Sequence, residues 1–178
     1  MIILLDNQTC SNCTDVWNTY EMQQWEAKWL MEFNPHKCEV ITITNKRSHI
    51  SYPYNIHGKE LVHIQHVKYL DLTFSNNLSW NKHIDNITKK ANATCAFLRR
   101  NINSCSRQVK AQCFTTLVYP NLEYAATVWD PYTKSNVNKI EKCQRCAARF
   151  VNGDYSRESS SVLKELKWPT LQQRRTNT

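Results

Sequence analysis

The sequence predicts an α+β fold, in which a small antiparallel sheet with one helix precedes an all-α helical bundle. Only two Gly and five Pro occur among the 178 residues, which disfavours a turn-rich all-β fold. Short β-branched segments occur within the first 78 residues, and the clearest helical periodicity follows them. We therefore expect two domains, residues 1–78 and residues 79–178.

The first domain is expected to contain one helix and several strands. The helix, residues 15–32, should end before Asn34-Pro35. A two-residue turn at His57-Gly58 should join two strands, because Gly readily adopts positive φ. The expected strands are residues 38–44, 52–56, 59–64 and 67–74.

A long helix is predicted after Ser79, which is a suitable N-cap residue. Its apolar residues lie within about 80° of one another on a helical wheel; they are Ile84, Ile87, Ala91, Cys95, Leu98 and Ile102. The opposite side, within about 60°, is polar and basic; it carries Lys82, Asn86, Lys89, Ala93 and Arg100. One face is therefore expected to join the core and the reverse face to form a basic stripe.

Further helices are predicted in the rest of the second domain. One should start at Ser106 and be interrupted by Pro120, which can open a short helix over residues 121–129. Another should cover residues 135–151 and stop at Gly153. A short final helix is expected over residues 159–166.

Charge is spread unevenly along the chain. The net charge is +8, but residues 1–35 carry −4 and residues 79–111 carry +6. A local excess of this kind suggests a polyanionic partner. The alternative is a solvated basic face without a partner.

The sequence also bears on cellular context and on metal binding. The apolar start, residues 1–5, is too short for a signal peptide or a membrane span. We expect an intracellular protein, in the cytoplasm or nucleus, with free thiols and without membrane association. Two Cys-x-x-Cys pairs occur, at Cys10/Cys13 and Cys143/Cys146, but 129 residues separate them. Packing of small apolar thiols is therefore favoured over a shared zinc site, and no metal site is expected.

Six sequence blocks are spread over much of the chain: WLMEFNPHKCEV (29–40), VKYLDLTFSNNLSWNKHIDNITKKA (67–91), FLRRN (97–101), LVYPNLEYAATVWDPY (117–132), IEKCQRCAARFV (140–151) and LKWPTLQQRR (166–175). In this order they resemble the reverse transcriptases of non-LTR retrotransposons of the LINE or jockey type. The resemblance implies that residues 1–78 form the C-terminal end of a polymerase palm. It implies that residues 79–178 form a thumb, which grips a template-primer duplex.

Two departures from that family concern the chemistry. The resemblance places the family's catalytic Asp-Asp block before this chain begins, and no Asp-Asp or Asp-Glu pair occurs in it. Catalysis in the family uses Mg held by clustered carboxylates, so we expect no cofactor and no catalytic activity in this chain alone. The second departure is Asp71, which stands where the family has Gly.

The resemblance also matches Lys37 to a palm lysine that lies near the incoming nucleotide.

The resemblance also bears on the basic residues of the second domain. A thumb helix should present such residues to the backbone phosphates of an RNA/DNA or RNA template-primer duplex, with sequence-independent and salt-dependent binding. The expected contacts are Lys82, Lys89, Lys90, Arg99, Arg100, Arg107 and Lys110. The alternative hypothesis is a non-catalytic structural or protein-interaction module, or a decayed transposon product without function. The last residues, QQRRTNT, suggest a cut rather than a finished end.

Overall fold

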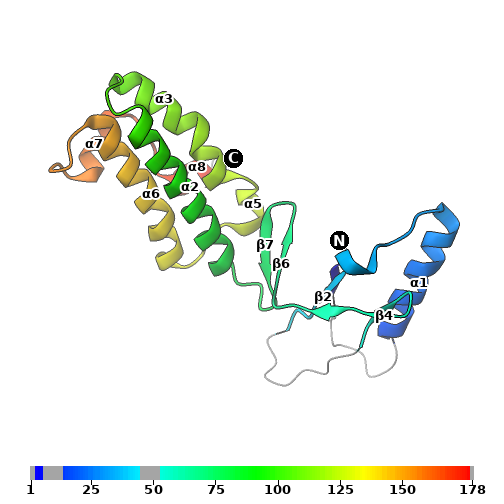
Figure 1. Cartoon of the computed structure of the whole chain (residues 1–178). Coiled ribbons are helices and arrows are strands. Elements are labelled where there is room, and N and C mark those ends of the chain that lie inside the picture. The colour runs from blue at the N-terminus through cyan, green and yellow to red at the C-terminus, as the bar shows by residue number, and fades with distance from the viewer. Residues whose placement is uncertain (1–2, 6–13, 45–52, 177–178) are drawn as a thin grey trace. The chain divides into compact units, whose positions relative to one another are not determined.

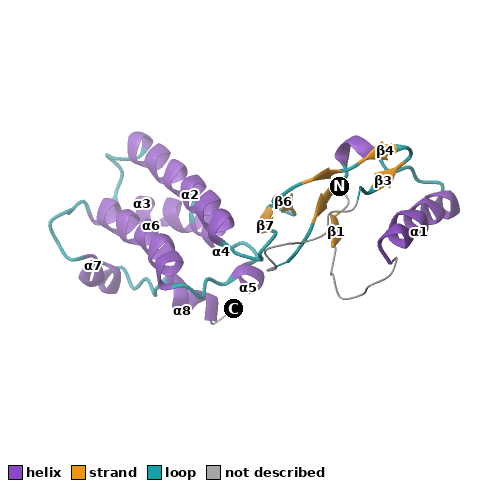
Figure 2. Ribbon diagram, turned by 90° about the horizontal axis from the view of Figure 1, so that it is seen from below, coloured by secondary structure: helices purple, strands orange, loops and turns teal. Residues whose placement is uncertain are grey.

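A computed structural model describes residues 3–5, 14–44 and 53–176. The chain forms two compact units, Met1–Ser79 and Trp80–Thr178. The first unit combines strands with a helix, and the second is helical (Figures 1 and 2). The fold class is therefore α+β.

The first unit contains a three-stranded sheet and two hairpins among its described residues. Its elements are β1 (Ile3–Leu5), α1 (Thr14–Trp29), the 3₁₀ helix η1 (Pro35–Lys37), β2 (Glu39–Ile41), β3 (Asn55–Ile56), β4 (Lys59–Glu60), β5 (Val62–His63), β6 (His66–Tyr69) and β7 (Leu72–Ser75). The three-stranded sheet has the order β1-β2-β5, and both of its pairings are parallel. The prediction of a small antiparallel sheet is therefore confirmed only for the two hairpins, β3–β4 and β6–β7, because the three-stranded sheet is parallel. In β2 the consecutive residues Val40 and Ile41 are both buried, as is typical of parallel strands covered on both faces.

Both hairpins of the first unit turn through two residues with positive φ. His57 and Gly58, at φ 52° and 76°, join β3 to β4 as predicted. Leu70 and Asp71, at φ 46° and 66°, join β6 to β7. The prediction of one strand over residues 67–74 is therefore wrong, because this turn contains neither Gly nor Asn to mark it.

The turn at Leu70 and Asp71 offers a stability test. Leu pays a steric cost in the left-handed region, which Asp tolerates better, whereas Asn-Gly suits both positions of this type of turn. Leu70 is 68% exposed, so its replacement removes little packing. The double variant Leu70→Asn, Asp71→Gly should therefore raise the free energy of unfolding by about 1 kcal/mol. Urea denaturation of the full chain measures this change, and an equal or lower midpoint would contradict it.

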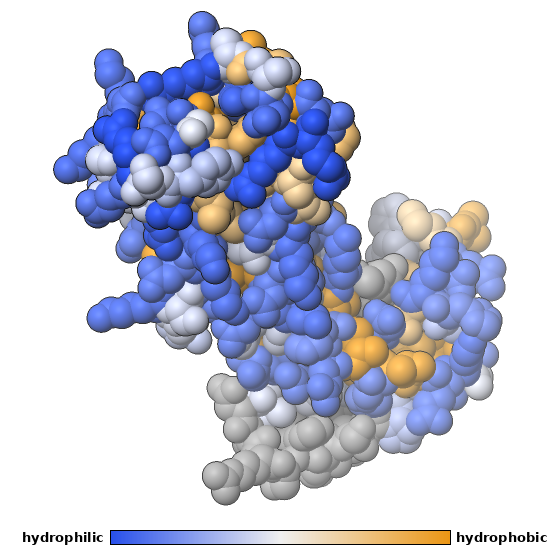
Figure 3. Space-filling model, turned by 60° about the vertical axis from the view of Figure 1, so that its left-hand side comes forward, coloured by the Kyte–Doolittle hydropathy of each residue, from blue (hydrophilic) through white to orange (hydrophobic). Residues whose placement is uncertain are grey.

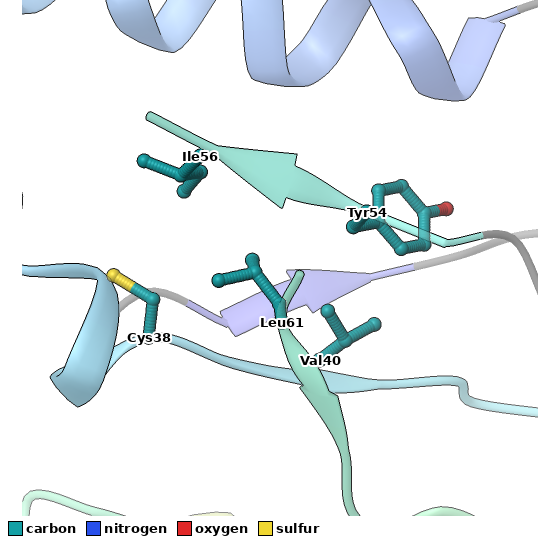
Figure 4. Close-up of a cluster of buried hydrophobic side chains, with 5 residues drawn as sticks. All are labelled: Cys38, Val40, Tyr54, Ile56 and Leu61. Carbon is teal, nitrogen blue, oxygen red and sulfur yellow. The ribbon is translucent and has the colours of Figure 1, made fainter. Parts of the chain in front are cut away.

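A small apolar cluster forms the core of the first unit (Figure 4). Its buried members are Cys38, Val40, Tyr54, Ile56 and Leu61, with Met22 and Phe33 packed against them. The helix α1 contributes the buried carboxylate of Glu26, which accepts a hydrogen bond from the Phe33 N–H. The same carboxylate lies 3.0 Å from His57 Nε2. A single side chain of α1 thus contacts both the chain before η1 and the β3–β4 turn.

The second unit is built around one long central helix. Its elements are α2 (Asn81–Asn101), α3 (Arg107–Leu117), α4 (Tyr119–Glu123), α5 (Ala126–Trp129), α6 (Lys134–Asn152), α7 (Ser159–Glu165) and α8 (Leu171–Thr176). The central helix α6 packs against α2, α3, α7 and α8, and Figures 1 and 2 both show α2 beside α6. Its buried residues, including Ile140, Ala147 and Val151, recur at helical spacing.

Two of the three capping residues predicted in this unit, Ser106 and Gly153, begin or end helices as expected. Ser106 accepts a hydrogen bond from the Val109 N–H at the start of α3. Gly153 ends α6 at φ 73°, and its N–H donates to the Arg149 carbonyl. The prediction of Ser79 as N-cap is wrong, because α2 begins at Asn81 and Trp80 occupies the cap position without a side-chain hydrogen bond.

A buried polar group joins three elements in the core of the second unit. Gln144 is fully buried, and its Nε2 donates to the Tyr119 hydroxyl at 2.9 Å and to the Pro169 carbonyl at 2.8 Å. Burial raises the pKa of Tyr119 to about 12, although its hydrogen bond to Gln144 opposes that rise. The amide of Gln144 therefore connects α6 to α4 and to the chain before α8.

Candidate nucleic-acid interface

Four of the predicted contact residues lie together on the outer side of α2. The helix buries Ile84, Ala91 and Leu98, so the side opposite these residues faces solvent. The exposed residues there include Lys82, Lys89, Lys90 and Arg100. Among the described residues, no ion pair neutralises Lys82, Lys89 or Arg100. Three positive charges on one helix side thus remain available to a polyanion.

The other three predicted contact residues have protein partners. Arg99 donates from Nη2 to the Cys146 carbonyl at 3.1 Å, in the junction between α2 and α6. Arg107 forms an ion pair with Glu165 at 2.6 Å. The Lys110 ammonium lies 5.1 Å from the centre of the Phe150 ring. The structure therefore brings these three residues against α6 and α7, and not onto the outer side of α2.

The helix α6 adds further cations to those of α2. Lys134, Lys139 and Lys142 are exposed, and Arg145 and Arg149 are half-buried. All five lie away from the buried side of α6. The spacing of α6 alone predicts this polar side, but it contains no information about which helix lies next to it.

Contacts between α2 and α6 bring their basic sides next to each other. Asn136 donates to Asn81 Oδ1 at 2.7 Å near the start of both helices. Further along, Lys139 Nζ lies 2.7 Å from Asp85 Oδ1. The two helices therefore run parallel, with Asp85 and Lys139 at their outer junction. We use the term cationic surface for the outer residues of both helices, which are Lys82, Lys89, Lys90, Arg100, Lys134, Lys139, Lys142, Arg145 and Arg149.

The cationic surface has little opposing charge. Asp85 lies about 40° from Lys89 around α2, and its carboxylate is already paired with Lys139. The one acidic residue of α6, Glu141, is buried and accepts a hydrogen bond from the Gln172 N–H at 2.9 Å. In Figure 3, hydrophilic residues cover much of the visible face of the helical unit. The arrangement suits electrostatic contact with phosphates.

Lys37, the matched palm lysine, lies in the first unit and is exposed at the end of η1. Asn34 caps η1 by accepting a hydrogen bond from the His36 N–H at 3.0 Å. Within the described ranges, no group of three or more His, Cys, Asp or Glu residues could hold a metal ion. The described residues therefore do not fit the Mg that the family resemblance implies, and we assign them no catalytic step.

The described cysteines are free thiols, and two of them are buried between α2 and α6. Burial raises the pKa of Cys143 to about 11 and also raises the pKa of Cys95. Cys146 is half-buried, whereas Cys10 and Cys13 lie outside the described residues. Cys143 and Cys95 are consequently protonated near neutral pH and pack as small apolar groups between the two helices.

Comparison with curated proteins relates the chain to polymerases of mobile elements. It is 30% identical over 156 residues to the RNA-directed DNA polymerase from mobile element jockey of Drosophila melanogaster, with 84% of the chain covered. It is 28% identical over 160 residues to the jockey polymerase of Drosophila funebris. A third relative, at 22% identity, is a probable RNA-directed DNA polymerase from transposon X-element of Drosophila melanogaster. The chain spans 17% of the length of each of these relatives.

These similarities define the class of protein. The chain is related to a segment of the RNA-directed DNA polymerases of mobile elements. Within that class, its relatives are the reverse transcriptases of jockey-type non-LTR retrotransposons, so the predicted resemblance is confirmed. No family model and no solved structure matches the chain. No helix among the described residues is long and apolar enough to cross a membrane.

Proposed function

We propose that this chain is the duplex-binding segment of a retrotransposon reverse transcriptase and that it does no chemistry alone. In this proposal the first unit is the end of the palm and the second unit is the thumb. The ligand is an RNA/DNA or RNA template-primer duplex, held through its backbone phosphates. The cationic surface on α2 and α6 is the observation that carries the proposal.

The physical basis is the release of counterions. A duplex carries a condensed layer of cations, and each phosphate that a Lys or Arg neutralises frees part of that layer. Contacts from the four α2 cations alone would give a slope of about −4 for log K against log salt concentration. Such binding needs no side chains that hydrogen-bond to base edges, because contacts to the phosphate backbone position a protein without reading the sequence.

A binding experiment tests this proposal. We expect fluorescence anisotropy with a labelled 16-base-pair RNA/DNA hybrid to show a slope of about −4 or steeper between 50 and 300 mM KCl. Two hybrids of unrelated sequence should bind equally. No binding at 50 mM KCl, or a slope shallower than about −1, would contradict the proposal. A parallel primer-extension reaction with Mg and deoxynucleotides should yield no product from the chain alone.

A second candidate function is a protein-interaction module. It is favoured by the apolar residues at the end of α1, where Trp29, Leu30 and Met31 are 57%, 93% and 58% exposed. Three consecutive exposed apolar side chains can form part of a protein contact. A stably folded chain without affinity for the hybrid at low salt would favour this function.

A further inference from the structure

A single large apolar side chain lies on the otherwise polar outer side of α2. Phe97 is 55% exposed. On a helix with 3.6 residues per turn it lies about 60° from Arg100 and about 20° from Lys90. Lys90 is two turns before Phe97, and Arg100 is one turn after it. The ring therefore belongs to the same side of α2 as these cations.

Packing within the chain does not explain this position. Most buried residues of α2 lie about 100° or more from Phe97 around the helix, and His83, which is closer in angle, lies about four turns before it. The neighbouring Asn101 uses its side chain to donate to the Phe97 carbonyl at 2.8 Å. Single exposed apolar residues are common on protein surfaces. Phe97 differs in its surroundings, because its neighbours on the outer side of α2 include Lys90, Arg100 and the small Ala93, and no other large apolar side chain.

The surrounding charges favour one type of partner. An apolar protein surface placed over Phe97 would also remove water from Arg100, which forms no ion pair among the described residues, and leave this cation without a counter-charge. A nucleic acid offers phosphates for the cations and the flat faces of bases for the ring. Aromatic rings among basic residues are typical of surfaces that stack on unpaired bases.

Resting on the proposed function, we infer that Phe97 stacks on an unpaired base of the bound nucleic acid. In a continuous duplex each base is covered by its neighbours, so a ring can stack only at an end or beside a single-stranded overhang. The preferred ligand is then a duplex with an adjacent unpaired strand, which the α2 and α6 cations hold through its phosphates. Phe97 supplies the preference for the overhang, and the cations supply the salt-dependent affinity.

The test compares two probes at one salt concentration. The first is a blunt 16-base-pair RNA/DNA hybrid, and the second is the same hybrid with a four-nucleotide overhang containing 2-aminopurine. The wild-type chain should bind the overhang probe about 5- to 100-fold more tightly and quench its fluorescence. Phe97→Ala should lose this preference and the quenching, with an unchanged salt slope. Phe97→Trp should keep both.

Controls separate this inference from the proposed function. Tyr132→Ala removes another exposed ring, 81% exposed and outside α2, and should behave as wild type. Equal binding of both probes by the wild-type chain, or an unchanged preference in Phe97→Ala, would overturn the inference alone. Failure of the wild-type chain to bind either probe would overturn the proposed function and the inference together.

Discussion

Reversing two charges on α2, with Lys89→Glu and Arg100→Glu together, should weaken binding of an RNA/DNA hybrid on the order of 100-fold at 0.1 M salt. Each reversal replaces an attraction to phosphate, worth about 1 kcal/mol at 4 Å in water, with a similar repulsion. The two reversals together would cost about 4 kcal/mol of binding free energy without salt. Screening over a Debye length of about 10 Å reduces this cost, and a remaining loss of about 2.8 kcal/mol corresponds to the 100-fold weaker binding. The salt slope should become shallower by about 2.

The matched control changes the same amount of charge elsewhere on the second unit. Lys164 and Lys167 are exposed, at the end of α7 and just after it, and neither belongs to the cationic surface. Lys164→Glu with Lys167→Glu should therefore weaken binding much less. Anisotropy titrations over a salt series measure both variants. Equal weakening in the two double variants would mean that net charge matters and that the cationic surface is not the interface.

Trp129→Ala should destabilise the helical unit by about 3–5 kcal/mol. Trp129 is fully buried, and its Nε1 donates to the Tyr124 carbonyl at 2.8 Å. Its ring lies edge-on to that of His83, with the ring centres 5.1 Å apart. The substitution removes a large apolar volume and leaves a cavity. Since a typical domain is stable by only about 5–15 kcal/mol, the substitution should remove a large part of the stability of the helical unit.

Urea denaturation followed by circular dichroism measures this effect. Trp29→Ala is a chemically identical change at a residue that is 57% exposed, and it should cost less than about 1 kcal/mol. A Trp129→Ala protein as stable as the wild type would mean that the ring does not pack in the core as described.

Local chemistry explains which parts of the fold could be predicted. The apolar spacing of α2 and the Gly153 stop of α6 depend on residues close together in sequence, and both predictions are confirmed. The parallel pairing of β1 with β2 joins Ile3 to Glu39 across a long stretch of chain. Such a contact is not encoded in local periodicity. The helix α8 was missed because it is short and its sequence has little amphipathic pattern.

The candidate site was predictable to a similar extent. Helical spacing correctly predicted that Lys89 and Arg100 share the exposed side of α2. It did not show that Arg99, one residue away, points into the junction with α6. The contribution of Lys142 depends on which helix packs beside α2, and that choice arises from side-chain contacts between distant segments. The role of these residues in binding stays a prediction.

The segment containing α8 matters for anyone who wants to shorten the helical unit. Leu171 is fully buried, the Gln172 N–H satisfies Glu141, and Arg174 forms a two-pronged ion pair with Glu123. Deleting residues after α7 would also remove the Pro169 carbonyl that accepts from Gln144. Such a deletion would leave buried polar groups unsatisfied and an apolar gap in the core. A shortened version of this unit should therefore keep α8, through Thr176.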